Sequence, residues 1–216
     1  EIDEVVATTA RFGFEPVRTF TDPTRAFALL LLRLRGRRTV TAGRERSAGS
    51  HLAAARARTL ELIEPLTDDQ LMHQHSPLMS PIIWDLGHIA NYEEQWSLRA
   101  LDPAAPVADA DRHRDHLYDP IAHPRRTRNA LPLPDRAGSL AYLQAIRLRT
   151  RERLREVSFD PSDPLLADGY VYKMIAQHEA QHTETILQTI QLIDDLVYEP
   201  GRRYEPPGAA VPIGTE

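Results

Sequence analysis

The sequence predicts an all-α fold, a four-helix bundle with one long crossover. A short β-hairpin-like extension is expected to precede the bundle. Apolar residues recur at helical spacing in four long stretches after residue 50. The connection between the second and third stretches, residues 102–135, is long, irregular and rich in Pro, Asp and His. A long connection in a compact domain is usually functional or a crossover, and bundles are built with such crossovers.

Capping residues predict where the first helices begin. Ser50 can cap a helix that ends before Pro65, and the segment 67–70 (T-D-D-Q) forms a capping box for a short helix. Ser80 followed by Pro81 predicts the second long helix, because proline is favoured at the first helical position. We expect this helix to run to about Leu101.

The third long helix is expected to begin at Asp135 or Ser139, and the fourth to run from about Asp168 to Leu196. Both carry apolar residues at helical spacing. In the fourth helix these residues are Val171, Met174, Ile175, Ile186, Ile190 and Ile193.

The chain divides into three parts. Residues 1–49 form an extension, in which Glu15 to Asp22 and Phe27 to Leu34 predict a β-hairpin and residues 36–49 a linker. Residues 50–200 form the bundle, and residues 201–216 a Pro- and Gly-rich linker.

Composition excludes several functions. The net charge of −5 gives no general attraction to nucleic acid. With no cysteine, a disulfide framework, thiolate metal ligands and a cysteine nucleophile are excluded. No apolar run approaches the roughly 20 residues of a membrane helix, so we expect a cytoplasmic protein with no membrane or nucleic-acid partner.

Two histidines in the fourth helix indicate a metal site. His178 and His182 lie four residues apart, so on a helix they project from one face, about 6 Å apart along the axis. Both fall on or beside the apolar stripe, where buried imidazoles need partners and a shared metal ion satisfies both. The alternative is a pair of ordinary histidines.

A third ligand must be His, Asp or Glu, and His88 is the strongest candidate because it lies mid-helix in a mostly apolar segment. The alternative for His88 is a core histidine bonded to a neighbour such as Tyr92. Three imidazoles would suit Fe(II), Zn, Ni or Cu, and the ligand type alone does not choose among them.

Residues 178–182 (H-E-A-Q-H) also fit the zinc-protease pattern H-E-x-x-H. The rest of that pattern is absent, because Thr185 and Gln188 stand where its extended form needs Gly and His. Glu199 follows in a Pro/Gly-rich tail rather than on a second helix. The sequence therefore disfavours a protease.

Three segments resemble the DinB-like N-terminal domain of the sulfoxide synthases (hercynine oxygenases) of ergothioneine biosynthesis. They are Gln74 to Trp96 (Q-H-S-P-L-M-S-P-I-I-W-D-L-G-H-I-A-N-Y-E-E-Q-W), Leu117 to Arg128 (L-Y-D-P-I-A-H-P-R-R-T-R) and Tyr172 to Thr185 (Y-K-M-I-A-Q-H-E-A-Q-H-T-E-T). The resemblance covers about residues 52–200 and implies a DinB-like bundle. It also implies a non-haem Fe(II) enzyme that uses O2 to join trimethylhistidine to a thiol, either γ-glutamylcysteine or cysteine.

The resemblance also assigns roles to single residues. The iron ligands correspond to His88, His178 and His182, and Gln181 to a residue that helps place trimethylhistidine. Arg125 and Arg128 correspond to arginines that hold the carboxylates of the thiol, for which a guanidinium offers paired hydrogen bonds. The alternative for both is an exposed arginine on a loop.

Members of this family continue into a second domain similar to formylglycine-generating enzymes, which supplies a catalytic tyrosine. No tyrosine here matches that position, so we assign no catalytic residue and expect full activity only with such a domain, toward which residues 201–216 would lead. Residues 13–32 resemble the C-terminal tail of the pathway's histidine methyltransferase, without its methyl-donor loop. Two alternatives remain: a Zn- or Ni-dependent thiol transferase, and a metal-stabilised module without catalysis.

Overall fold

The structure is a computed structural model that describes residues 5, 14–21, 28–34, 41–105, 113–194, 196 and 198. The described chain forms two compact units, residues 1–40 and residues 41–216. In the first, strands β1 (Phe14–Thr21) and β2 (Ala28–Leu34) pair antiparallel, with Phe14 opposite Leu34 and Thr21 opposite Ala28. The predicted hairpin strands are confirmed, whereas its turn, residues 22–27, lies outside the described residues.

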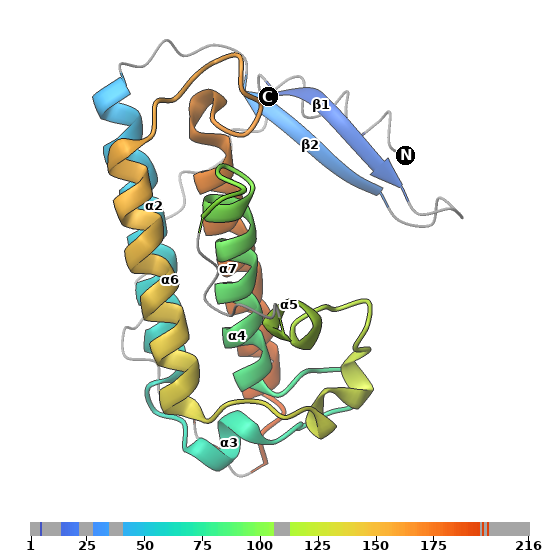
Figure 1. Cartoon of the computed structure of the whole chain (residues 1–216). Coiled ribbons are helices and arrows are strands. Elements are labelled where there is room, and N and C mark those ends of the chain that lie inside the picture. The colour runs from blue at the N-terminus through green and yellow to red at the C-terminus, as the bar shows by residue number, and fades with distance from the viewer. Residues whose placement is uncertain are drawn as a thin grey trace, which may run out of the picture. The chain divides into compact units, whose positions relative to one another are not determined.

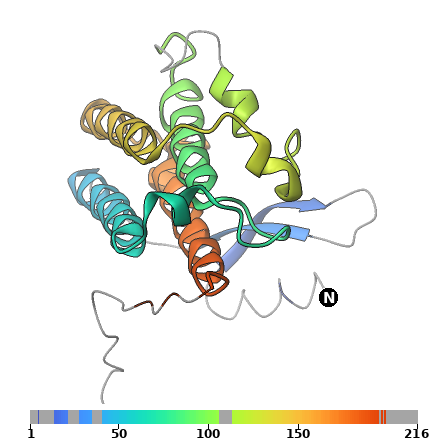
Figure 2. The same cartoon turned by 90° about the horizontal axis from the view of Figure 1, so that it is seen from below.

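The second unit is a four-helix bundle, as predicted. Its long helices are α2 (Thr41–Ile63), α4 (Ile82–Glu93), α6 (Arg136–Glu156) and α7 (Tyr170–Ile190). A π-helix, η1 (Glu94–Arg99), extends α4. Viewed along the bundle, the helices occupy four corners, with α4 and α2 at opposite corners (Figure 2).

The connections make α4 and α6 parallel to each other and antiparallel to α2 and α7 (Figure 1). Helix α3 (Asp68–Met72) lies between α2 and α4, and the short helix η3 (Ala167–Gly169) precedes α7. The crossover from α4 to α6 contains α5 (His113–Leu117) and the 3₁₀ helix η2 (Arg125–Ala130). The predicted long crossover is therefore confirmed, and it passes beside α4 (Figure 1).

Two helix starts differ from the sequence prediction. Helix α2 begins at Thr41, not at Ser50, so part of the expected linker is helical. Helix α4 is preceded by Pro81 without a side-chain cap, and the hydroxyl of Ser80 instead accepts a hydrogen bond from Arg128 at 2.6 Å. The capping box of α3 is confirmed, because Thr67 and Gln70 exchange both hydrogen bonds.

The core divides into two clusters of buried apolar side chains. One joins α4 to the C-terminal parts of α2 and α7 and the start of α6, and includes Ile63, Ile82, Leu86, Leu143 and Ile186. The other lies at the opposite end and includes Leu52, Leu154, Val171, Tyr172 and Ile175. In the part of the chain that the structure describes, no helix is long and apolar enough to cross a membrane.

Candidate metal centre

Three histidines from two helices converge inside the bundle. Each of His88, His178 and His182 offers one ring nitrogen, and these three nitrogen atoms lie within 4.8 Å of one another. The ring centroids are 5.0 Å apart for His88 and His178, 4.9 Å for His88 and His182, and 4.6 Å for His178 and His182. Among the described residues, this is the one group of three potential metal ligands. The structure thus brings together the three residues that the sequence analysis selected.

The local sequence explains this convergence. On α7, His178 and His182 are one helical turn apart and share a face. His88 lies in α4, in which nearly every side chain is buried, and its ring contacts those of His178 and His182 on α7. Because α4 packs against α7, the three rings meet between the two helices.

Hydrogen bonds orient two of the three rings. Nδ1 of His88 lies 2.8 Å from the carbonyl oxygen of Tyr118, and Nδ1 of His182 lies 2.9 Å from Oδ1 of Asp85. A carbonyl or a carboxylate oxygen only accepts, so each Nδ1 carries the proton and donates. The Nε2 lone pairs of His88 and His182 therefore remain available to a metal ion.

Stacked aromatic rings enclose the histidines. The ring of Tyr92 lies parallel to that of His178, with centroids 3.7 Å apart and planes 12° apart. The indole of Trp84 stacks on His88 at 4.8 Å and 11°. These contacts restrict ring rotation, which favours a preorganised ligand set.

Burial and neighbouring histidines keep two of the imidazoles neutral. Burial, and next the charge of His182, lower the pKa of His88 from 6.5 to about 4. Burial likewise lowers the pKa of His178 to about 2, followed by the charges of His182 and His88. Neutral imidazole is the form that binds metals, so both rings are ready to bind at neutral pH.

Glu179, the glutamate of H-E-x-x-H, points away from the histidines. Its side chain is 1% exposed, and it accepts from Arg56 at 2.6 Å and from Arg147 at 2.6 Å. A protease needs this carboxylate beside a metal-bound water as general base. Held by two arginines in the bundle core, Glu179 cannot take that role, which agrees with the sequence analysis.

The other predicted site residues lie on α7 and on η2. Gln181 is exposed on α7, between the two histidines in sequence. Arg125 is exposed on η2 and donates from Nη1 to the carbonyl of Leu78 at 3.0 Å. Arg128, also on η2, is only 5% exposed, so it is not the exposed loop arginine considered as an alternative.

Sequence reasoning did not identify Asp85 and Tyr118 as parts of the site. Asp85 lies three residues before His88, on the same side of α4, and this i, i+3 spacing is a signal that could have indicated it. Tyr118 contributes a backbone carbonyl, which has no side-chain signature in a sequence.

The residues present fit a divalent transition metal. Three neutral imidazoles offer nitrogen donors, and two of them are oriented by acceptors on their second nitrogen, as is usual for histidine ligands. Without a shared partner, one buried and two half-buried rings would leave polar nitrogens facing one another.

The fold and the site define a helical-bundle protein with three histidines gathered between two helices. Residues 51–186 match the DinB superfamily, and the chain belongs to this superfamily.

The chain is also similar to curated proteins named hercynine oxygenase. It is 41% identical to that of Mycobacterium tuberculosis over 142 residues, which are 66% of this chain and 32% of the relative. Identity is 40% over 141 residues with that of Mycolicibacterium smegmatis, covering 65% of this chain and 31% of the relative. With the hercynine oxygenase of Mycolicibacterium thermoresistibile the identity is 39% over 141 residues, which are 65% of this chain and 30% of the relative. The similarity thus spans about a third of each relative's length.

Proposed function

We propose that this chain is the Fe(II)-binding helical part of a hercynine oxygenase in ergothioneine biosynthesis. The observation that carries the proposal is the convergence of His88, His178 and His182 in a chain about 40% identical to proteins of that name. The relatives are named for hercynine, which is trimethylhistidine, and for an oxygenase reaction.

The proposed reaction joins the imidazole of trimethylhistidine to the sulfur of γ-glutamylcysteine or cysteine. A C–H and an S–H bond are broken and C–S and S–O bonds form, while O2 supplies the sulfoxide oxygen and is otherwise reduced to water. Bound Fe(II) would supply the activation of O2. The chain's own residues would hold the metal through three nitrogens and leave further coordination positions open.

Other residues would bind the substrates. Gln181 is proposed to help place trimethylhistidine, and Arg125 and Arg128 to bind the carboxylates of the thiol. A second domain, similar to formylglycine-generating enzymes, would supply the proton donor and the remainder of the pocket.

Anaerobic titration of the purified chain with Fe(II) is the first test. We expect one ion per chain, and loss of binding in His88→Ala. The matched control is His73→Ala, because His73 lies outside the site and contacts His75 instead. Unchanged binding in His88→Ala would contradict the proposed triad.

The reaction is tested by adding the second domain of a relative together with trimethylhistidine, γ-glutamylcysteine and O2. The expected product is the sulfoxide whose sulfur is bonded to the imidazole carbon and to the carbon of the former thiol, formed only with Fe(II) and O2. Thiol transfer supported by Zn or Ni without O2 would instead identify a thiol transferase. Metal binding without turnover of any thiol would identify a non-catalytic module.

A further inference from the structure

Arg128 is linked to the metal ligand His88 through the indole of Trp84. Its guanidinium carbon lies 3.5 Å from the centroid of the Trp84 ring, and Trp84 stacks on His88 with planes 11° apart. Three flat groups, from η2 and α4, are therefore in successive contact. Displacing the guanidinium removes a surface that fixes the position of Trp84, against which His88 rests.

Arg128 is itself held on two sides. Its Nε donates to the carbonyl of His123 at 2.8 Å, and its Nη1 donates to the hydroxyl of Ser80 at 2.6 Å. Burial lowers the pKa of Arg128 to about 10, so the group stays charged at neutral pH. Lysine cannot replace these contacts, because a compact ammonium lacks both the flat stacking face and the fork of donors.

The same crossover fixes the direction of the His88 ring. Trp84 donates from Nε1 to the carbonyl of Leu117 at 3.1 Å, while His88 donates to the next carbonyl along, that of Tyr118, at 2.8 Å. Arg128 belongs to the same crossover, eleven residues after Leu117 in sequence. The crossover therefore sets both the plane of the His88 ring and the direction of its Nδ1–H bond.

We propose that Arg128 is a positioning residue for His88, acting through Trp84, in addition to any contact with a substrate. This inference rests on the metal site of the proposed function. It distinguishes Arg128 from its neighbour Arg125, which is exposed. Among the described residues, Arg125 has no cation–π contact like that of Arg128 with Trp84.

The test uses Co(II) alone as the probe, bound to the full chain. We would compare wild type with Arg128→Lys, Trp84→Phe and the control Arg126→Lys, in which the exposed neighbour on η2 is changed. The readouts are the Co(II) affinity, its visible absorption bands, and the shifted proton signals of the ligand N–H groups. The N–H signal that changes in Asp85→Asn is assigned to His182. The signal of the second hydrogen-bonded Nδ1–H group is then that of His88.

We expect Arg128→Lys to weaken Co(II) binding about tenfold, as is typical for groups that orient metal ligands. The absorption bands should change, and the His88 N–H signal should move or exchange faster while that of His182 stays in place. Trp84→Phe should produce the same pattern, whereas Arg126→Lys should match wild type.

Three results would overturn the inference. One is an Arg128→Lys variant with the affinity, absorption and N–H signals of Arg126→Lys, which would leave the proposed function standing. The second is equal loss of both N–H signals, or failure of both Arg128→Lys and Trp84→Phe to fold, which would mean general support of the fold. The third is a wild-type chain that binds no Co(II) and no Fe(II), which removes the proposed function as well.

Discussion

At the scale of single residues, the site depends on partners that hold the imidazoles in place. Asp85 is 1% exposed, and its Oδ1 accepts from His182 at 2.9 Å. Its Oδ2 is buried without a hydrogen-bond partner among the described residues. A carboxylate in this position fixes the tautomer of the imidazole and would raise its basicity toward a metal ion.

We predict that Asp85→Asn weakens Fe(II) binding by about 10- to 100-fold, because a neutral amide orients His182 less strongly. Anaerobic competition titration measures the effect. The control is Asp160→Asn, in an exposed turn after α6, which should bind Fe(II) like wild type. Equal affinity in Asp85→Asn and wild type would show that His182 does not need this carboxylate.

The convergence of the three histidines could be predicted from the sequence, but the contacts that support their rings only in part. Four-residue spacing on an amphipathic helix places His178 beside His182, and an apolar helix marks His88 as inward-facing. The stacking of Arg128 on Trp84 could not be predicted, because it depends on where the crossover returns to α4. Long connections carry no periodic pattern from which such a path can be read.

At the scale of elements, the crossover lies directly against α4 at a glycine. A Cβ built on Gly87 would lie 2.1 Å from Cζ of Tyr118, far inside contact distance. The small residue therefore lets the Tyr118 ring cover the helix next to His88. The carbonyl of the same tyrosine holds the His88 ring.

We predict that Gly87→Ala destabilises the fold by about 1–3 kcal/mol, although alanine favours helices, because the Tyr118 ring must move. Urea unfolding measures this change, and Fe(II) binding should weaken in parallel as Tyr118 shifts. Gly49→Ala in α2 is the matched control, since its new Cβ would meet only Leu154 at 3.8 Å. That variant should be as stable as wild type or more stable by up to about 1 kcal/mol. If Gly49→Ala lost more stability than Gly87→Ala, the packing of Tyr118 on Gly87 would be contradicted.

A second contact ties α5 of the crossover to η1. Arg99 donates to both carboxylate oxygens of Asp115, at 2.7 Å and 2.6 Å, and Asn91 donates to Oδ1 at 2.9 Å. Burial raises the pKa of Asp115, but the hydrogen bonds from Arg99 and Asn91 outweigh it, so the pKa falls from 3.8 to about 2.

We predict that this contact is lost in acid. Because the folded pKa lies below the unfolded value, the contribution is fully present above about pH 4 and disappears as the pH falls toward 2. The free energy of unfolding, measured at several pH values, should fall less steeply over this window in Asp115→Asn than in wild type. The exposed control Asp194→Asn should keep the wild-type slope, and an unchanged slope in Asp115→Asn would rule out the contact as the cause.

The long helices were predictable because their apolar stripes repeat over several turns, whereas the start of α2 was not. Residues 41–49 contain Gly43 and Gly49 and three charged residues, and they lack an apolar stripe. Among the side chains that the structure describes near this end, Ala48 and Leu52 are buried, in one cluster with Leu154 and Val171. Tertiary contacts at a few positions therefore extend the helix beyond the part that its own sequence indicates.

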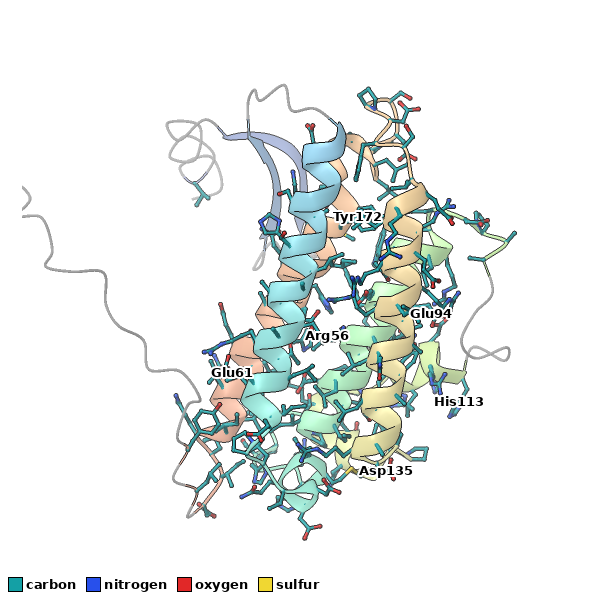
Figure 3. All side chains as sticks on the ribbon, turned by 90° about the vertical axis from the view of Figure 1, so that its left-hand side faces the viewer. Arg56, Glu61, Glu94, His113, Asp135 and Tyr172 are labelled. Carbon is teal, nitrogen blue, oxygen red and sulfur yellow. The ribbon has the colours of Figure 1, made fainter. Side chains whose placement is uncertain are left out.

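At the scale of the whole bundle, four charged side chains, one from each long helix, form a buried network. Arg56 of α2 and Arg147 of α6 both bind Glu93 of α4 and Glu179 of α7. The arginines also donate to carbonyls, Arg56 to that of Leu143 at 2.9 Å and Arg147 to that of Leu52. Figure 3 shows Arg56 on the side of α2 that faces α6, and Glu61 of the same helix on the side away from α6.

We predict that Glu179→Ala destabilises the fold by about 3–5 kcal/mol, because it leaves two buried arginines short of a partner. Chemical denaturation measures the loss, and Glu61→Ala is the control. Glu61 pairs with Arg58 at 3.7 Å on the surface, so its removal should cost no more than about 0.5 kcal/mol. Similar losses in the two variants would show that the buried network contributes no more than a surface pair.

This network also bears on how the chain folds during synthesis. The ribosome releases α2, α4 and α6 before α7, so until α7 emerges the network would offer Arg56 and Arg147 only Glu93, with one positive charge in excess. Glu179 neutralises it, and it lies on the same helix as His178 and His182. We therefore expect a nascent chain that ends before residue 170 to stay unfolded and unable to retain a metal ion, and the bundle to close around its site only when the last helix emerges.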